Sequence, residues 1–553
     1  MMTKLTQLLT CLSQGSSDSV QDGLTLSTLD KYLHIKRSIE DTLAAKMTAI
    51  NSENGGIVLL IGSAGDGKSH LISTIREDIQ FEGFRYHNDA TESYSPTKTA
   101  VECLKDVLIE YSDERINSTE QKLVLAINIG KLNAFIEDPE VKERFSVLVD
   151  FVNPLFEEGS LNLQDSKRIK VVQFTNQQIF EFDKDNDSEY PVDSIFLREF
   201  LKRITDQNTE NPFYTAYKNS IPLDNAVTDP VVLNYQLLSI PDVQNTIIKL
   251  VIESIVRFKL MVTPREFQDF VYTILVYEDL EHYTDDKCFL EALLPTMLYC
   301  GNRSKIQRAI AQLDPLKYSN TKHDNDLATL FTSDEVPAGF IDETINEYSP
   351  TLMNKVRLMC ANNRKNIMRT TQFLFRAKHL LSYHSESTEY ISYLRALRGF
   401  FNSDGQEVQA LYQMVNTVIP RHYGSYYSPE KTVPLNIQGS KHRLFATINL
   451  TPSEFFSYYE DANVFSLVLV LTWICQGATV TLNVDFQLYE YLFCLNNGKL
   501  SLNFDSSKNM SFSHFIRELV SKSENNSEII VMTADNQKYV LQRQFGVISY
   551  RKC

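Results

Sequence analysis

The sequence predicts an α/β protein with a parallel three-layer sheet and a nucleotide-binding loop, followed by a helical domain and a C-terminal β-rich α+β domain. Three observations predict this class. Residues 57–61 (IVLLI) are a short apolar run typical of a buried strand. A glycine-rich loop, Gly62–Ser69 (GSAGDGKS), follows at once, and residues 70–79 then have helical spacing. Strand and helix patterns alternate to about residue 180, which favours a parallel sheet.

The loop fits G-x-x-x-x-G-K-[ST], the pattern of a phosphate-binding loop (P-loop). Its three glycines let backbone N–H groups turn inward toward an anion. Lys68 would contact the β- and γ-phosphates, and the Ser69 hydroxyl would bind Mg²⁺. The alternative is a glycine-rich turn that matches by accident. Because the loop also stands between a strand and a helix, we predict a site for ATP and Mg²⁺. Its residues are Gly62, Ser63, Ala64, Gly65, Asp66, Gly67, Lys68, Ser69 and His70.

The chain divides into four predicted segments: a helical segment (1–50), the P-loop α/β domain (51–195), a lid-like helical domain (196–400) and the β-rich domain (401–553). A short helix is expected at 3–12, and longer helices are expected at 27–50 and 97–111. The helical domain should contain helices at 229–239, 242–261, 263–277 and 303–313. Further strands are expected at 84–87, 123–127, 169–174, 433–437, 443–450, 464–475, 479–486, 501–504, 529–533 and 538–544.

Composition narrows the classes of function. The 553 residues carry a formal net charge of −16, so any contact with nucleic acid must come from a local patch or a partner. The eight cysteines are scattered without a C-x-x-C pair, which argues against a zinc site or a disulfide framework and favours a reducing compartment. Residues 1–12 lack the pattern of a signal peptide, and the longest apolar run, 464–475, is too short to span a membrane. We expect a soluble cytoplasmic protein.

The residues that would support hydrolysis depart from the usual pattern of a strand followed by Asp-Glu. The strongest strand, 123–127, ends at Asn128, and no run of four apolar residues followed by Asp-Glu occurs in the α/β region. Asp89 and Glu92, after the strand at 84–87, are the nearest substitutes for the metal-supporting and water-orienting carboxylates. Asn176, after the strand at 169–174, could bond the γ-phosphate or the attacking water. For all three the alternative is ordinary turn or cap chemistry.

Two features of the helical domain could also contact ligands. Residues 262–266 (VTPRE) form a capping box, and Arg265 in the first turn of that helix could sense the γ-phosphate, or simply be an exposed arginine. Residues 349–384 contain no acidic side chain. Lys365, Arg369 and Arg376 there could form a DNA-contacting face, with Arg369 a second candidate for sensing the γ-phosphate. The alternative is a solvated or partner-facing helix. No nuclease site is recognisable.

Several segments of the sequence resemble the DptF family. Members of this family are subunits of the DptFGH restriction system, which acts with DNA phosphorothioation. The segments are GSAGDGKSHLI (62–72), HNDATESYSP (87–96), LVLAINIGKLN (123–133), VTPREF (262–267) and NRSKIQRAIAQLDP (302–315). The resemblance implies an AAA+-like P-loop ATPase that acts with two other subunits, DptG- and DptH-like, to restrict DNA lacking the phosphorothioate mark. It thereby implies a defence against phage and plasmids. The missing Asp-Glu pair departs from the AAA+ pattern.

Three functions therefore stay open. The leading expectation is an ATP-binding and ATP-hydrolysing subunit that gates or drives a DNA-restriction complex. A nucleotide-dependent switch or scaffold with little hydrolysis is the main alternative, favoured by Asn128 in place of an acidic residue. A small-molecule P-loop kinase is the third. DNA contact could be direct or through partners, and the chain could form a homo-oligomer.

Overall fold

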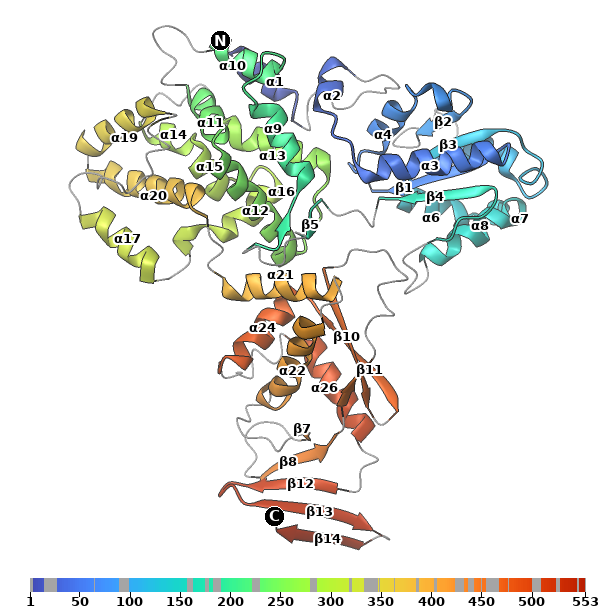
Figure 1. The fold of residues 1–553 in the computed structure, drawn as a ribbon, viewed down its shortest axis with the longest axis vertical. Helices are drawn as coiled ribbons and strands as arrows, with labels where there is room; N and C mark the ends of the chain where they lie inside the picture. The colour runs from blue at the N-terminus through green and yellow to red at the C-terminus, as the bar shows by residue number, and fades with distance from the viewer. Residues whose placement is uncertain are drawn as a thin grey trace. The chain divides into compact units, whose positions relative to one another are not determined.

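A computed structural model describes the chain in two compact units (Figure 1). Unit 1 comprises residues 1–181 and 193–384, and unit 2 comprises residues 182–192 and 385–553. This division is coarser than the four predicted segments. The structure describes residues 3–13, 27–63, 65–88, 99–156, 163–174, 179–182, 190–220, 229–278, 286–317, 321–332, 347, 349–362, 364–383, 387–401, 405–422, 432–435, 442–448, 450–453, 467–475, 477–499, 509–523, 528–544 and 547–552.

A four-stranded parallel sheet forms the α/β part of unit 1. Its strand order is β2-β3-β1-β4. The strands are β1 (Gly56–Gly62), β2 (Arg85–Asn88), β3 (Lys122–Asn128) and β4 (Ile169–Gln173). All seven residues of β1 are buried, as expected for a central strand of a parallel sheet. The predicted parallel sheet is confirmed.

Helices cover both faces of this sheet, which makes the predicted three layers (Figure 1). Alternate residues of β1 enter two separate hydrophobic clusters: Val58 and Leu60 face one cluster, and Ile57, Leu59 and Ile61 face the other. The first cluster includes α3 (Ser38–Ser52) and α4 (Lys68–Ile75). The second includes α5 (Ala100–Val107), α6 (Ile129–Glu137), α7 (Pro139–Arg144) and α8 (Ser146–Val152).

The single helix predicted over 27–50 is wrong in one respect. The chain forms two helices, α2 (Thr28–Leu33) and α3, and the residues between them are not helical. His34 (ψ 125°) and Arg37 (φ −117°, ψ 154°) have extended backbones. The apolar periodicity continues through this break, so periodicity alone could not reveal it. The break turns His34 and Arg37 toward the loop that follows β1.

The rest of unit 1 as described is mostly helical, as predicted. It includes the N-terminal helix α1 (Lys4–Thr10), which the sequence also predicts. The helices predicted at 229–239, 242–261, 263–277 and 303–313 correspond to α11, α12, α13 and α16, the last extended by a 3₁₀ turn over 311–313. The helical elements are α9 (Ile195–Thr205), α10 (Pro212–Ser220), α11 (Pro230–Leu238), α12 (Pro241–Phe258), α13 (Pro264–Leu275), α14 (Asp286–Glu291), α15 (Leu294–Cys300), α16 (Lys305–Ile310), α17 (Thr321–Thr332), α19 (Pro350–Asn362) and α20 (Arg364–Leu381). Two-residue strands β5 (Glu181–Phe182) and β6 (Val192–Asp193) pair with each other.

Unit 2 combines two antiparallel sheets with helices. A three-stranded sheet has the order β11-β10-β9, and a five-stranded sheet has the order β14-β13-β12-β8-β7. The strands are β7 (Thr432–Pro434), β8 (His442–Thr447), β9 (Leu450–Pro452), β10 (Leu469–Cys475), β11 (Ala478–Val484), β12 (Glu528–Thr533), β13 (Lys538–Gln544) and β14 (Val547–Lys552). The helices are α21 (Thr388–Phe401), α22 (Gly405–His422), α24 (Phe486–Asn496) and α26 (Met510–Ser523).

Several predictions for unit 2 are corrected. The predicted strand 443–450 is two strands that belong to different sheets, β8 and β9. The strand predicted to reach Phe486 ends at Val484, because Asp485 accepts a hydrogen bond from the Leu488 amide and begins α24. Helices α22, α24 and α26 and strand β14 were not predicted. The strand predicted at 501–504 lies outside the described residues.

Candidate functional site

The Gly62–Ser69 loop leaves the carboxyl end of β1, which lies between β3 and β4 in the sheet. Ligands of open parallel sheets bind at this edge. Gly65 (φ 88°) and Gly67 (φ 91°) have left-handed backbones that other residues rarely adopt. Gly67 is the N-cap of α4, so the positive end of the helix dipole lies at the loop. Ala64 lies outside the described residues.

Polar groups of the loop bond to one another. The Asp66 carboxylate accepts a hydrogen bond from the Ser63 amide, and the Lys68 ammonium donates one to the Ser63 carbonyl. Burial lowers the pKa of Lys68, although the nearby Asp66 charge opposes this shift. Burial likewise raises the pKa of Asp66, opposed by the Ser63 hydrogen bond and by Lys68. An anion bound to the Ser63 amide would therefore have to displace the Asp66 carboxylate.

The side chains of Ser69 and Asn88 meet beside the loop. Asn88 is the last residue of β2, and its Nδ2 donates a hydrogen bond to Ser69 Oγ over 2.7 Å. Asn88 Oδ1 is buried and has no hydrogen-bond partner among the described residues. A buried carbonyl oxygen without a partner is rare enough to need an explanation. Sequence reasoning missed Asn88, although its position just before Asp89 at a strand end was a usable signal.

Oxygen atoms of this kind suit a hard cation. Mg²⁺ prefers oxygen ligands and is often held by one or two protein groups together with the phosphates of its substrate. Ser69 Oγ and Asn88 Oδ1 fit this donor set. The described residues contain no cluster of three or more His, Cys, Asp or Glu side chains that could hold a metal ion. The local chemistry thus fits a Mg²⁺ ion that shares its coordination with phosphate oxygens.

Arg37 reaches the loop from the extended segment between α2 and α3. Its Nη2 donates a hydrogen bond to the Asp66 carbonyl over 3.1 Å, and its guanidinium carbon lies 5.3 Å from the centre of the Phe174 ring. A Cβ atom on Gly67 would lie 2.9 Å from Arg37 Nη2, so the glycine lets the guanidinium approach the backbone. Burial lowers the pKa of Arg37, yet the group keeps its charge at neutral pH. Arg37 therefore adds a positive charge to the loop, and no sequence pattern indicated this contact.

A histidine pair lies in the same region. His34 Nδ1 and His70 Nε2 are 2.8 Å apart, and His34 Nε2 lies 3.4 Å from the Glu40 carboxylate. Burial and the neighbouring His34 lower the pKa of His70 to about 4, so His70 is neutral at physiological pH. His70 follows Ser69 directly. The pair joins the first turn of α4 to the N-terminal segment.

The N-cap residue of α13, Thr263, lies close to the loop. A Cβ atom on Gly65 would lie 3.0 Å from Thr263 Oγ1. The predicted capping box is present: Thr263 Oγ1 accepts from the Glu266 amide, and the Glu266 carboxylate accepts from the Thr263 amide. Arg265 lies in the first turn of α13 and is half-buried. Its role as a sensor of the γ-phosphate stays a prediction.

The other positions considered in the sequence lie at the end of strand β3 or follow strands β2 and β4 along the chain. Asp89, Glu92 and Asn176 lie outside the described residues. Asn128 is the N-cap of α6, where its Oδ1 accepts a hydrogen bond from the Gly130 amide over 2.9 Å. That bond explains an amide at the end of β3 by helix capping alone.

The predicted DNA-contacting face on α20 requires a correction. Arg376 is buried, with an exposed fraction of 7%. Its Nε and Nη2 donate to the two carboxylate oxygens of Asp314 over 3.2 and 2.7 Å. Arg369, on the same helix, is exposed, and Lys365 lies near the N-terminus of the helix. Arg376 therefore stabilises the helical part of unit 1 and is not available to DNA.

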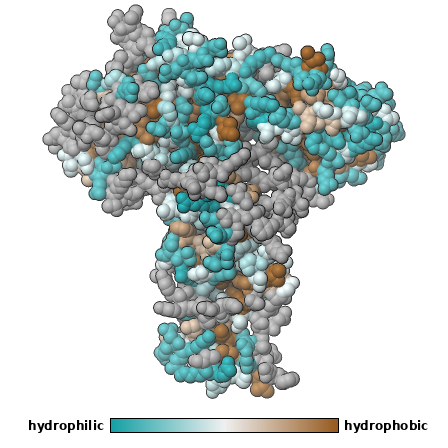
Figure 2. Space-filling view, viewed as in Figure 1, coloured by the Kyte–Doolittle hydropathy of each residue, from teal (hydrophilic) through white to brown (hydrophobic). Residues whose placement is uncertain are grey.

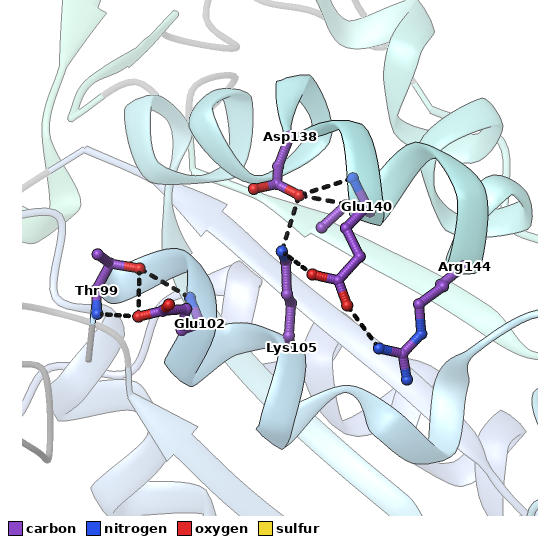
Figure 3. Close-up of polar contacts among 7 residues, drawn as sticks. Thr99, Glu102, Lys105, Asp138, Glu140 and Arg144 are labelled. Carbon is purple, nitrogen blue, oxygen red and sulfur yellow. Dashed lines mark hydrogen bonds and ion pairs between the residues drawn. The ribbon is translucent and has the colours of Figure 1, made fainter. Parts of the chain in front are cut away.

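A separate cluster of charges links α5 to α7 (Figure 3). Lys105 bonds to Asp138 and Glu140 over 2.8 and 2.7 Å, and Arg144 bonds to Glu140 over 2.7 Å. The hydrogen bond from Lys105 lowers the pKa of both carboxylates. Asp138 also caps α7, ahead of Pro139. These carboxylates are held ionised by cations and caps, so this cluster has a structural explanation and lacks an acid suited to proton transfer.

The loop, the α4 N-terminus, Lys68 and Arg37 can together bind an anion, and Ser69 with Asn88 can bind a divalent cation beside it. Comparison of the chain with models of protein families, with curated proteins and with solved structures gave no match. In the described part of the chain, no helix is both long and apolar enough to cross a membrane. The function is therefore inferred from the site.

Proposed function

We propose that this chain binds ATP with Mg²⁺ at Gly62–His70 and hydrolyses ATP as one subunit of a bacterial DNA-restriction complex. The observation that carries nucleotide binding is the contact between Asn88 Nδ2 and Ser69 Oγ, with Asn88 Oδ1 left unpaired beside it. A glycine-rich turn without a ligand would give no reason to bury that oxygen next to the serine of the motif.

The charge around the loop supports a polyphosphate. Lys68, Arg37 and the N-terminal end of α4 supply positive charge at one place. Phosphate groups are bound by this combination of helix N-terminus, backbone amides and cationic side chains. In this proposal Lys68 contacts the β- and γ-phosphates.

The metal site would use oxygen ligands. Ser69 would bind Mg²⁺ through its hydroxyl, Asn88 through its amide oxygen, and Asp89 would support the ion from the next position of the chain. A bound Mg²⁺ would neutralise charge on the phosphates during transfer. Glu92 would orient the attacking water, and Asn176 and Arg265 would contact the γ-phosphate.

A nucleotide-dependent switch with little hydrolysis is the second candidate. The observation that favours it is Asn128, whose side chain is used to cap α6 at the end of the strand beside β1. A carboxylate at such a strand end usually supports the metal in hydrolysing P-loop proteins. Without that carboxylate, ATP would stay bound and its hydrolysis would be slow.

The proposed role in restriction rests on the resemblance to the DptF family of the sequence segments outside the loop. In this proposal the chain acts with DptG- and DptH-like subunits on DNA that lacks phosphorothioate, and the nuclease activity belongs to a partner. DNA contact by Lys365 and Arg369 remains part of the proposal. The cytoplasm would be the place of action.

The test of nucleotide binding is the Lys68→Ala variant. Fluorescent ATP analogues should bind the wild-type chain in the presence of Mg²⁺, and Lys68→Ala should lose most of that affinity. Lys142→Ala, which removes an exposed lysine from α7, is the matched control and should bind normally. Full affinity in Lys68→Ala would refute the proposal.

Single-turnover hydrolysis separates the two candidates. A measurable rate that Asp89→Ala abolishes, with binding retained, supports an ATPase. Tight binding without turnover, alone and with DNA and the partner subunits, supports the switch. Host restriction of unmodified plasmid should be lost in Lys68→Ala in either case, and retained restriction would contradict the role in a restriction complex.

A further inference from the structure

The five-stranded sheet of unit 2 is basic, although the chain as a whole is acidic. Its strands contain a single acidic residue, Glu528, and five basic residues: Arg443, Lys538, Arg543, Arg551 and Lys552. The whole chain has a formal net charge of −16. Strands β13 and β14 contain no acidic residue at all. The strand register places Arg443, Lys538 and Arg551 on one face of the sheet and Arg543 and Lys552 on the other. Each face therefore has positive charge, which is the electrostatic signature of a surface that binds a polyanion.

The sheet has one protected edge and one open edge. Strand β7, at one edge, is three residues long, buried, and ends at Pro434, which are ordinary ways of protecting an edge. Strand β14, at the other edge, is exposed along all six residues. Its Val547, Ile548 and Tyr550 have exposed fractions of 67, 69 and 77%. Hydrophobic groups lie among hydrophilic ones on the surface of these strands (Figure 2).

The strand register places two tyrosines and a lysine on one face. Tyr539 of β13 is opposite Lys552 of β14, and Leu541 is opposite Tyr550. Residues opposite each other share a face, and residues two apart in one strand also share it. Tyr539, Tyr550 and Lys552 are therefore neighbours on the same side of the sheet.

That face is not the one that contains the small core of the sheet. The core consists of Phe445, Ile530 and Val540, and Val540 is opposite Arg551. Arg551 and Tyr550 are adjacent in the strand, so they point to opposite faces. The face of Tyr539, Tyr550 and Lys552, which we call the tyrosine face, thus lies opposite the core.

We propose that the tyrosine face binds single-stranded nucleic acid. Tyrosine rings on an open sheet stack on bases, and lysine neutralises the phosphates between them. Tyr550 is exposed and Tyr539 is half-buried beside it. Rings of this kind with nearby cations need no base-specific contact, so binding should tolerate many sequences. The competing occupant of an open edge is an extended protein strand. The absence of acidic residues from β13 and β14 favours the polyanion, because it gives no advantage to a neutral strand.

This inference does not rest on ATP binding, since the two sites lie in different units of the chain. The Lys68→Ala variant should bind nucleic acid as the wild type does in nucleotide-free buffer. Failure of either proposal can therefore be told from failure of the other.

The experiment uses the full chain and a fluorescein-labelled 20-nucleotide oligo-dT, followed by anisotropy across a series of salt concentrations. Tyr550→Ala should weaken binding at least about fivefold, because it removes one stacking contact. Tyr550→Phe keeps the ring and should bind as the wild type. Lys552→Gln should reduce the slope of log K against log salt by about 0.7, the value for one phosphate contact on a single strand. Lys142→Gln, in unit 1, is the matched control and should leave the slope unchanged.

Tyr550 and Lys552 are exposed at an edge, so these variants should fold, and circular dichroism checks this directly. Absence of binding by the wild-type chain would overturn the proposal. Equal binding by the wild type, Tyr550→Ala and Lys552→Gln would overturn it as well. Sedimentation that shows a concentration-dependent dimer abolished by Tyr550→Ala, with no binding of oligo-dT, would instead identify a protein strand as the occupant.

Discussion

Replacing Arg37 tests whether the N-terminal segment helps to form the loop. Arg37→Ala removes the hydrogen bond from Nη2 to the Asp66 carbonyl and the contact of the guanidinium with the Phe174 ring. Neither the Glu40 bond to the Arg37 amide nor the hydrophobic contacts of α3 depend on this side chain. The helix should therefore remain folded while the loop loses a support.

The magnitude follows from these two contacts. A hydrogen bond from a charged donor contributes about 1.5–3 kcal/mol, and a partly buried cation–π contact contributes about 0.5–2 kcal/mol. The two contacts share one side chain, and a water molecule can replace part of the hydrogen bond, so we take about 2–3 kcal/mol for the pair. If that energy holds the loop in its binding shape, the affinity for ATP should fall about 30- to 150-fold.

Titration with a fluorescent ATP analogue and Mg²⁺ measures this effect. Hydrogen exchange of residues 65–75 should show faster opening in Arg37→Ala, and Arg37→Lys should recover only part of the affinity because a lysine lacks the planar fork. Arg115→Ala, which removes an exposed arginine paired with Glu110, is the matched control and should bind ATP normally. An Arg37→Ala chain that folds and binds ATP as tightly as the wild type would refute the reasoning.

Two further predictions concern stability. The fold lowers the pKa of His70 from 6.5 to about 4, so it favours neutral His70. The resulting stability is complete above pH 6.5 and is lost as the pH falls toward 4, by about 3 kcal/mol for a shift of this size. Between pH 7.5 and 5 about 2 kcal/mol of this loss should occur, so hydrogen exchange of α4 should show a loss of this size in the wild type and a smaller one in His70→Gln. Equal losses would contradict it. Arg376→Ala leaves Asp314 buried without its partner and should lower the free energy of unfolding by about 3–5 kcal/mol. Arg369→Ala, on the same helix but exposed, should change it by less than about 0.5 kcal/mol, and urea denaturation monitored on unit 1 compares the two.

The parts of the fold that the sequence predicted well are those encoded by local pattern. The strands around Ile57–Ile61 and Leu123–Ile127 are near-continuous apolar runs. Such runs are typical of the buried strands of a parallel sheet. The capping box at Thr263 is equally local, and it is present as expected. Gly65 and Gly67 fall where left-handed backbones occur, so the loop pattern also agreed with the backbone it implies.

The parts that the sequence did not predict depend on distant residues. Arg37 lies within a continuous apolar periodicity, and its contacts with Asp66 and Phe174 join parts of the chain that are far apart in the sequence. Arg376 looked like a member of a basic face because its partner, Asp314, is 62 positions away in the chain. Charge in a sequence does not reveal burial, and no local rule links these two positions.

The contacts of the loop also suggest how nucleotide binding would change the positions of α3 and α13 in unit 1. Phosphate binding at the Ser63 amide requires the Asp66 carboxylate to leave it, and Asp66 is the residue whose carbonyl holds Arg37. Gly65, one position earlier, lies against Thr263, the cap of α13. A movement of Asp66 would therefore act on α3 through Arg37 and on α13 through Thr263. Because this coupling would need binding alone, we expect it in both an ATPase and a switch, and hydrolysis would only set how long the altered state lasts.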